Sequence, residues 1–220
     1  MHARGSGRHY ALMSVLRATT SGVWRTYFYW LFWISVVFFT VYPACNWLTA
    51  QRETVYSLYL AEELHIPFVP EFVWLYLSLY LLFFMPPFVL GASRMNSLGK
   101  RLVGATLFCG AVFLLFPAEL GFERAVPSDP FYASIFAHLF AVDLPHNMVP
   151  SLHVTFSSMI LFALAEDARS VPVKMLFRTW LVLICASTVL VHQHHLLDVV
   201  TGLLVAAAFY HVADKGGHHV

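Results

Sequence analysis

The chain has 220 residues, of which 59% are hydrophobic and 11% charged, and its mean hydropathy is +0.69. This composition excludes an ordinary soluble domain and predicts an integral membrane protein. A net charge of +1 without a basic stripe argues against nucleic acid as a partner, and three cysteines in apolar segments without CxxC spacing indicate neither a disulfide framework nor a zinc site.

The N-terminal arm, residues 1–25, contains four arginines and no acidic residue, so we expect it to be cytoplasmic, with a flexible start at Gly5 to Gly7. A first transmembrane span is predicted at 27–48. The segment 51–71 is too polar to span and is expected near the opposite interface.

Further apolar runs predict spans at 72–92, at 102–120 and at 151–164, a fifth that ends near Val191, and a sixth at 196–213. Between the third and fourth spans, 131–142 has the spacing of an interfacial helix. We therefore predict an all-α, polytopic membrane protein: one domain, residues 1–220, forming a six-transmembrane-helix bundle with short interfacial helices.

Arginine and lysine predominate on one side of this topology, which predicts cytoplasmic termini. Three polar features then fall on the opposite, extracytoplasmic side: Arg124, the segment 150–153 and the segment 192–198. We expect the protein in the cell membrane with its active site on that side.

The segment 187–202 is a polar island between two apolar runs. In a helix, His194 and Asp198 are i,i+4 neighbours, so the carboxylate can orient one ring nitrogen while the other faces a substrate. Two alternatives remain open from the residues alone: histidines that only solvate a helix end, and a metal site.

The fourth span begins with Pro150-Ser151-Leu152-His153. Free backbone N–H groups and the helix dipole at such a start favour a phosphate group, and the Ser151 hydroxyl adds a donor. A histidine two residues later can donate a proton to a leaving oxygen. The alternative interpretation is ordinary helix capping.

Together, the two segments resemble the signature of the type-2 phosphatidic acid phosphatase superfamily of membrane lipid phosphatases and phosphotransferases. Pro150, Ser151 and His153 match its P-S-x-H motif, and Ser187, His194 and Asp198 match its S-R-x-x-x-x-x-H-x-x-x-D motif. Both short motifs occur in order on one predicted membrane face.

The resemblance implies that His194 attacks phosphorus to form a phosphohistidine, that Asp198 orients it, and that His153 protonates the leaving alcohol. It also implies no metal and no cofactor. The phosphate would be bound by a set of side chains and nearby backbone N–H groups: Ser151, Leu152, Arg124, Ser187 and Thr188.

Some positions depart from the family pattern. Arg124 precedes Ala125 where the family's first motif has proline, so Arg124 is alternatively a loop charge paired with Glu123. Thr188 replaces the arginine of the last motif, and the added His192 makes the string similar to inositol phosphorylceramide and sphingomyelin synthases. We expect three residues to support the site: His192, His195 and Asn147.

The predicted function is a phosphohydrolase that acts on a lipid phosphate monoester through a phosphohistidine. The alternative is a phosphotransferase that passes a phospho-head-group from a phospholipid to a lipid alcohol with the same histidines. A third possibility, from another class, is a scaffold or transporter that keeps its histidines for proton coupling.

Overall fold

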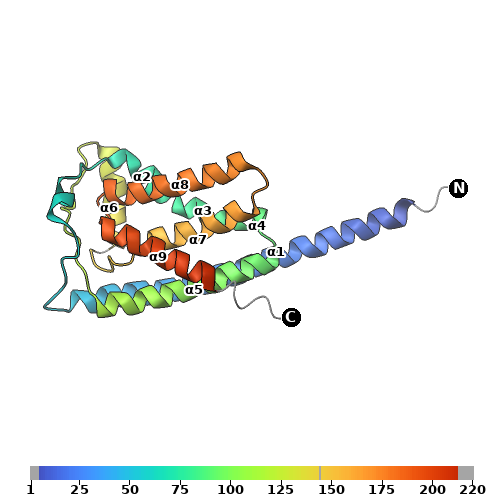
Figure 1. The fold of residues 1–220 in the computed structure, drawn as a ribbon, viewed down its shortest axis with the longest axis horizontal. Helices are drawn as coiled ribbons and strands as arrows, with labels where there is room; N and C mark the ends of the chain where they lie inside the picture. The colour runs from blue at the N-terminus through green and yellow to red at the C-terminus, as the bar shows by residue number, and fades with distance from the viewer. Residues whose placement is uncertain (1–4, 144, 213–220) are drawn as a thin grey trace.

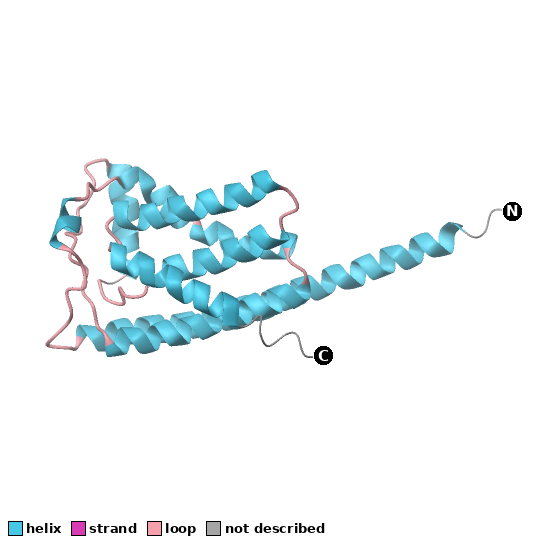
Figure 2. Cartoon of the chain, viewed as in Figure 1, coloured by secondary structure: helices cyan, strands magenta, loops and turns pink. Residues whose placement is uncertain are grey.

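The computed structural model describes residues 5–143 and 145–212, and within these residues every regular secondary-structure element is a helix (Figure 2). Residues 1–4 of the predicted N-terminal arm and the C-terminal end of the chain lie outside the described residues. A single isolated bridge joins Tyr56 and Ala118. The all-α prediction is confirmed for this part of the chain.

The first helix, α1 (Gly5–Ala50), is longer than predicted. It includes the segment Gly5 to Gly7, for which we expected a flexible start, and it continues through Pro43. Its N-terminal part extends beyond the bundle, and the rest packs along α5 (Ala92–Leu115) (Figure 1). The chain between them is a polar loop followed by short helices.

The predicted second span is divided into short pieces. After the 3₁₀ helices η1 (Ala61–His65) and η2 (Pro70–Phe72), the short helices are α2 (Val73–Leu77), α3 (Leu79–Phe84) and α4 (Pro86–Val89). Proline has no N–H to donate and its ring clashes with the preceding turn, so the Pro86-Pro87 pair starts a new helix. The break at Ser78 is held by Trp180, whose Nε1 donates to the serine hydroxyl over 2.9 Å.

The second half of the chain supplies the remaining helices: α6 (Pro130–Val142), α7 (Leu152–Asp167), α8 (Val171–Leu190) and α9 (Leu196–Val212). The interfacial helix predicted at 131–142 corresponds to α6, and Asp129 caps it by accepting the Phe131 N–H. Helix α7 is the central helix, with contacts to α3, α5, α8 and α9. Its residues are buried on nearly every side.

Three of the described helices are long and apolar enough to cross a membrane: 20–50, 92–115 and 171–190. The six spans of the prediction are therefore not found. The sequence contains the apolar residues, but α7 has 16 residues and α9 has 17, and the second run is broken at Ser78 and Pro86. Mean hydropathy records apolar content, not where a helix stops.

The polar loops gather at one end of the bundle, beside α6, and the N-terminus lies at the opposite end (Figure 1). The loops that meet there are 51–72, 116–129, 143–151 and 191–195. At the far end, Arg94 forms ion pairs with Glu166 at 2.9 Å and Asp167 at 3.0 Å, which fixes the C-terminal end of α7 to the start of α5. The candidate site lies at the loop end.

Candidate active site

The start of α7 is bound directly to α9. Ser151 is the N-cap of α7, with its hydroxyl accepting the Val154 N–H at 3.2 Å, and its own N–H donates to the Asp198 carbonyl at 3.1 Å. Thr155 bridges the two helices, because its hydroxyl lies 2.8 Å from the Ser151 carbonyl and 3.1 Å from that of Gly202. These bonds bring together the two motifs, which are forty residues apart in the chain.

Gly202 allows this approach because it has no side chain. A Cβ atom built there would lie 2.8 Å from the Ser151 carbonyl oxygen and 3.1 Å from the Val154 Cβ. Only glycine lets α9 lie this close to the backbone at the start of α7.

His194 and Asp198 form the expected pair, with 3.1 Å between Nδ1 and Oδ2, and both side chains are buried. His194 lies in the loop before α9 rather than in the helix. Asp198 is in the first turn of α9, where its carboxylate also accepts the His195 N–H at 2.8 Å, as the acidic residue of a capping box does. Asp198 engages Nδ1 of His194 and leaves Nε2 as the other reactive nitrogen of the ring.

His153 is held by Tyr76. The two rings stack with centroids 4.0 Å apart, and the imidazole hydrogen-bonds to the Tyr76 backbone, while its buried Nε2 has no protein partner. His194 is close enough to interact electrostatically with His153. A buried ring nitrogen without a partner is costly, and at a catalytic position it is the atom that exchanges a proton with the substrate.

Asp143 fixes the other end of Tyr76. Its carboxylate accepts the hydroxyl of Tyr76 at 3.2 Å and, through its other oxygen, the hydroxyl of Tyr42 from α1. Asn147 binds the same turn of α1, because its Nδ2 donates to the Tyr42 carbonyl at 2.9 Å. The loop that follows α6 therefore positions Tyr76, and through it the His153 ring.

Arg124 shares a pocket with His194. The pocket is narrow, and its lining also includes Tyr42, Asp143, His146 and Gln193. The guanidinium donates to the carbonyls of Phe140, at 3.0 Å, and of Asp143, and lies over the Phe140 ring. Burial lowers the pKa of Arg124, while Asp143 and the two tyrosines oppose this. These bonds orient the guanidinium toward α6 and not toward Glu123, while its buried Nε has no protein partner.

Ser187 and Thr188 contact their own helix. Their hydroxyls donate to the carbonyls of Ile184 at 2.7 Å and of Cys185 at 2.8 Å. The Thr188 carbonyl accepts the N–H groups of Gln193 and His194, both at 3.0 Å. The structure thus shows Thr188 holding the His194 backbone, and it places neither hydroxyl in the pocket with Arg124.

Leu152 is the first residue of α7, where backbone N–H groups lack partners within the helix. Its buried side chain packs in the main core, so any contribution to anion binding comes from the backbone alone.

His192 and His195 belong to a stack of four rings behind His194. In order the rings are Tyr59, His195, Phe122 and His192, with centroid separations of 4.4, 4.3 and 4.0 Å. His192 adopts a positive φ of 54°, and its Nε2 lies 2.9 Å from the Ile66 carbonyl. The stack joins three loops that are distant in sequence.

Sequence reasoning missed Glu63, Tyr76 and Asp143 as parts of this site. Glu63 is buried beside His195, with 3.2 Å between Oε2 and Nδ1. Each of these residues is a single polar or aromatic side chain without a recurring spacing, so the sequence holds no local signal that separates it from its neighbours.

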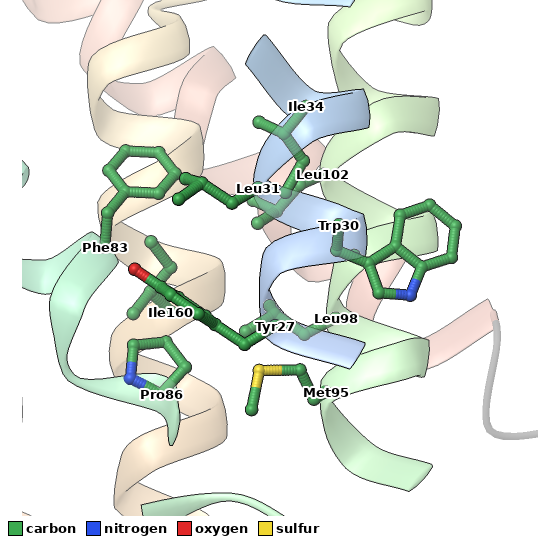
Figure 3. Close-up of a pocket in the computed structure, with 11 residues that line it drawn as sticks. Tyr27, Trp30, Leu31, Ile34, Phe83, Pro86, Met95, Leu98, Leu102 and Ile160 are labelled. Carbon is green, nitrogen blue, oxygen red and sulfur yellow. The ribbon is translucent and has the colours of Figure 1, made fainter. Parts of the chain in front are cut away.

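Two further observations bear on the site. Among the described residues, no group of three or more His, Cys, Asp or Glu side chains is arranged to hold a metal ion. A second pocket lies between α1, α4, α5 and α7 (Figure 3). Its lining is almost wholly apolar and includes Tyr27, Met95 and Ile160, with the Tyr27 hydroxyl as its titratable group.

No protein-family model, curated protein or solved structure matches the chain.

Proposed function

We propose that this protein is a membrane phosphatase that removes phosphate from a lipid phosphate monoester through a phosphohistidine on His194. The observation that carries the proposal is the geometry of His194. Asp198 holds its Nδ1 at 3.1 Å, and the residue lines a pocket with Arg124 and lies near His153. An oriented nucleophile, a fixed cation and a second histidine are the groups that phosphoryl transfer by way of a covalent intermediate requires.

In the first step, Nε2 of His194 forms a bond to phosphorus while the bond from phosphorus to the lipid oxygen breaks. The negative charge of the bound phosphate favours the protonated form of His153, which donates its proton to that oxygen, so the lipid leaves as an alcohol. Arg124 and the backbone N–H groups at the start of α7 balance the charge on the remaining phosphate oxygens. Asp198 stabilises the positive charge that develops on His194.

In the second step, neutral His153 takes a proton from water, and the water oxygen attacks phosphorus. The bond between nitrogen and phosphorus breaks, inorganic phosphate leaves, and both histidines return to their starting states. No step requires an oxidant or a cofactor.

A head-group phosphotransferase is the second candidate. Its support is the H-x-H-x-x-x-D string at 192–198, which resembles that of inositol phosphorylceramide and sphingomyelin synthases. In such an enzyme a lipid hydroxyl takes the place of water in the second step. Thr188 in place of the family's arginine points in the same direction.

We further propose that α7, α9 and the broken helix α2 to α4 cross the membrane together with the three long helices. Both termini would then be cytoplasmic, and the loop end with His194 would face the extracytoplasmic side of the cell membrane. The excess of arginine and lysine in the N-terminal arm and in the turns at the opposite end supports this orientation.

The test is phosphate release by the purified protein in detergent, with chelator present, from a panel of phosphatidate, polyprenyl phosphate and sphingoid phosphate. We expect His194→Ala to abolish both release and an acid-labile, base-stable label on the protein. His153→Ala is expected to slow release by about 10²–10⁴-fold. The matched control is His138→Ala, an exposed histidine on α6, which is expected to stay within twofold of wild type.

Three results would refute the hydrolase. Activity that survives His194→Ala would exclude the phosphohistidine. Labelling without release, followed by transfer to added diacylglycerol or ceramide, would identify the phosphotransferase instead. A folded protein that neither releases nor carries phosphate with any of these lipids would exclude both enzymes.

A further inference from the structure

Glu63 is a buried carboxylate with three N–H donors around it. It lies in η1, is 4% exposed, and is separated from α9 by more than 130 residues. Its Oε1 accepts the Leu60 N–H at 3.1 Å. Its Oε2 accepts the Leu196 N–H at 2.8 Å and lies 3.2 Å from Nδ1 of His195. Such a group is kept buried only if its charge is well solvated by hydrogen bonds.

The position of the proton on His195 follows from its two partners. Its Nε2 accepts the Gly121 N–H at 3.0 Å, so this nitrogen carries no proton. The proton of the neutral ring is therefore on Nδ1, which donates to Glu63. Burial lowers the pKa of His195, although Asp198 and Glu63 oppose this, and the low pKa agrees with a neutral ring.

Glu63 remains charged in this environment. Burial raises the pKa of its carboxyl, but hydrogen bonds from the Leu196 and Leu60 backbone, together with His195, outweigh burial and bring the pKa below its usual value. The carboxylate also lies at the N-terminus of α9, where the helix dipole favours a negative charge.

Two carboxylates therefore hold two successive N–H groups at the start of α9. The His195 N–H donates to Asp198, and the Leu196 N–H donates to Glu63. The Asp198 oxygen that accepts the His195 N–H is also the one that lies 3.1 Å from Nδ1 of His194. A shift of this backbone turn would move Asp198 relative to His194, so the orientation of His194 depends on both carboxylates.

We propose that Glu63 is a positioning residue of the active site, which fixes the tautomer of His195 and the first turn of α9 and thereby the geometry of His194 and Asp198. This inference deepens the proposed function and rests on it. Glu63 does not line the pocket with Arg124, so it acts through other residues and not on the substrate.

The site requires a carboxylate at position 63. Glutamine has one acceptor oxygen, so its amide NH₂ would face either the Leu60 N–H or the pair of donors from His195 and Leu196. Aspartate keeps both acceptors on a chain that is one methylene shorter. We therefore expect activity to fall in the order Glu63, Glu63→Asp, Glu63→Gln, even though glutamine has the same size as glutamate.

The experiment compares wild type, Glu63→Gln, Glu63→Asp and the control Glu62→Gln, an exposed carboxylate in the same 3₁₀ helix. Kinetics on the lipid phosphate that wild type hydrolyses best, or transfers, give kcat and KM for the folded fraction. We expect Glu63→Gln to lower kcat by about 10²-fold with KM within threefold, because misplacing a catalytic group by about 1 Å has an effect of this order. Glu62→Gln should match wild type.

A second measurement does not depend on activity. Nitrogen-15 spectra of histidine-labelled protein distinguish a protonated from an unprotonated ring nitrogen, and His195→Gln identifies the His195 signals. We expect a neutral ring protonated on Nδ1 in wild type and in Glu62→Gln. In Glu63→Gln the Gly121 N–H still favours this tautomer, but the loss of the carboxylate on Nδ1 should add a detectable fraction of the other one.

The outcomes separate the two proposals. If Glu63→Gln changes the tautomer but keeps wild-type kcat, or loses activity only in proportion to its unfolded fraction, Glu63 is structural and the positioning role is wrong. If wild type has no activity that depends on His194, the proposed function fails, and the positioning role fails with it whatever the tautomer shows. If His195 in wild type is protonated on Nε2, the hydrogen-bond argument itself is wrong.

Discussion

For Gly202→Ala, helix propensity predicts a gain in stability, whereas packing predicts a loss. Alanine in the interior of a helix is favoured over glycine by about 1 kcal/mol. At this position, however, the added Cβ would lie 2.8 Å from the Ser151 carbonyl oxygen, and a backbone atom cannot turn aside as a side chain does. Helix α9 must therefore move away from α7 by several tenths of an ångström.

The cost can be worked out from the contacts. Overpacking a tight interface costs about 1–3 kcal/mol. Weakening the hydrogen bonds from Ser151 to Asp198 and from Thr155 to Gly202 adds about 0.5–1.5 kcal/mol each. After the gain in helix propensity, the net loss is about 1–5 kcal/mol, and its midpoint of about 3 kcal/mol corresponds to a fall in Tm of about 6–12 °C for a chain of this size.

Thermal unfolding in detergent measures this loss, and phosphate release measures its effect on the site. We expect release to fall by about 10-fold or more, because the same shift separates His194 from the start of α7. The matched control is Gly22→Ala in α1, where a Cβ meets nothing within 4 Å. Only the gain in helix propensity applies there, so this variant should be slightly more stable than wild type. A Gly202→Ala protein as stable as Gly22→Ala would refute the close packing of α7 against α9.

Substitutions at three other residues test separate contacts. Tyr76→Phe keeps the ring stack on His153 and loses one hydrogen bond to Asp143, so kcat should fall by less than about 10-fold, whereas Tyr76→Leu loses both and should fall further. Arg124→Lys cannot bind two carbonyls in the same way, so kcat/KM should recover only partly relative to Arg124→Ala in the same assay. His195 has a lowered pKa in the folded protein, so the unfolded chain takes up its proton first, and Tm should fall as the pH decreases from about 7 to about 5. This dependence should be weaker in His195→Gln, and an unchanged slope would show that His195 does not contribute to it.

The sequence predicted those parts of the site that depend on short-range geometry. Ser151 lies at a helix start, so its contact with Val154 follows from capping rules. His194 and Asp198 pair as expected, but by another route: His194 lies in the loop before α9, and Asp198 reaches it from the first turn of the helix. The pairing of the two motifs rested on a family resemblance, and the bonds between Ser151, Thr155 and α9 now give it a structural basis. The catalytic roles stay predictions.

Other parts of the site depend on contacts that no local pattern encodes. Glu63 meets His195 across 132 residues, and its neighbour Glu62 is exposed, so nothing near them in the chain tells one from the other. Ser187 and Thr188 fit a motif for phosphate binding, yet hydroxyls within a helix readily bond to the carbonyls of the preceding turn, as both do here. Motif spacing does not show whether these hydroxyls bind phosphate or the carbonyls of their own helix.

The described residues form fewer long apolar helices than the sequence has apolar runs, and the reason is related. An apolar run can be longer than the helix that forms within it. In the second run, the stereochemistry of Pro86-Pro87 starts a new helix, and the break at Ser78 is held by Trp180 from another helix.

The short central helix has a consequence for the surrounding bilayer. Sixteen residues of α7 span about 24 Å, several ångströms less than a typical hydrocarbon core of about 30 Å. Both ends of α7 are fixed, by Ser151 to α9 and by Arg94 to α5, so the helix cannot slide to compensate. On the proposed topology, the other helices separate α7 from the lipids, so its short length leaves His153 below the level of the lipid head groups. The rate of phosphoryl transfer should therefore depend on acyl-chain length in the host bilayer, with thinner membranes bringing phosphate closer to the level of the histidines.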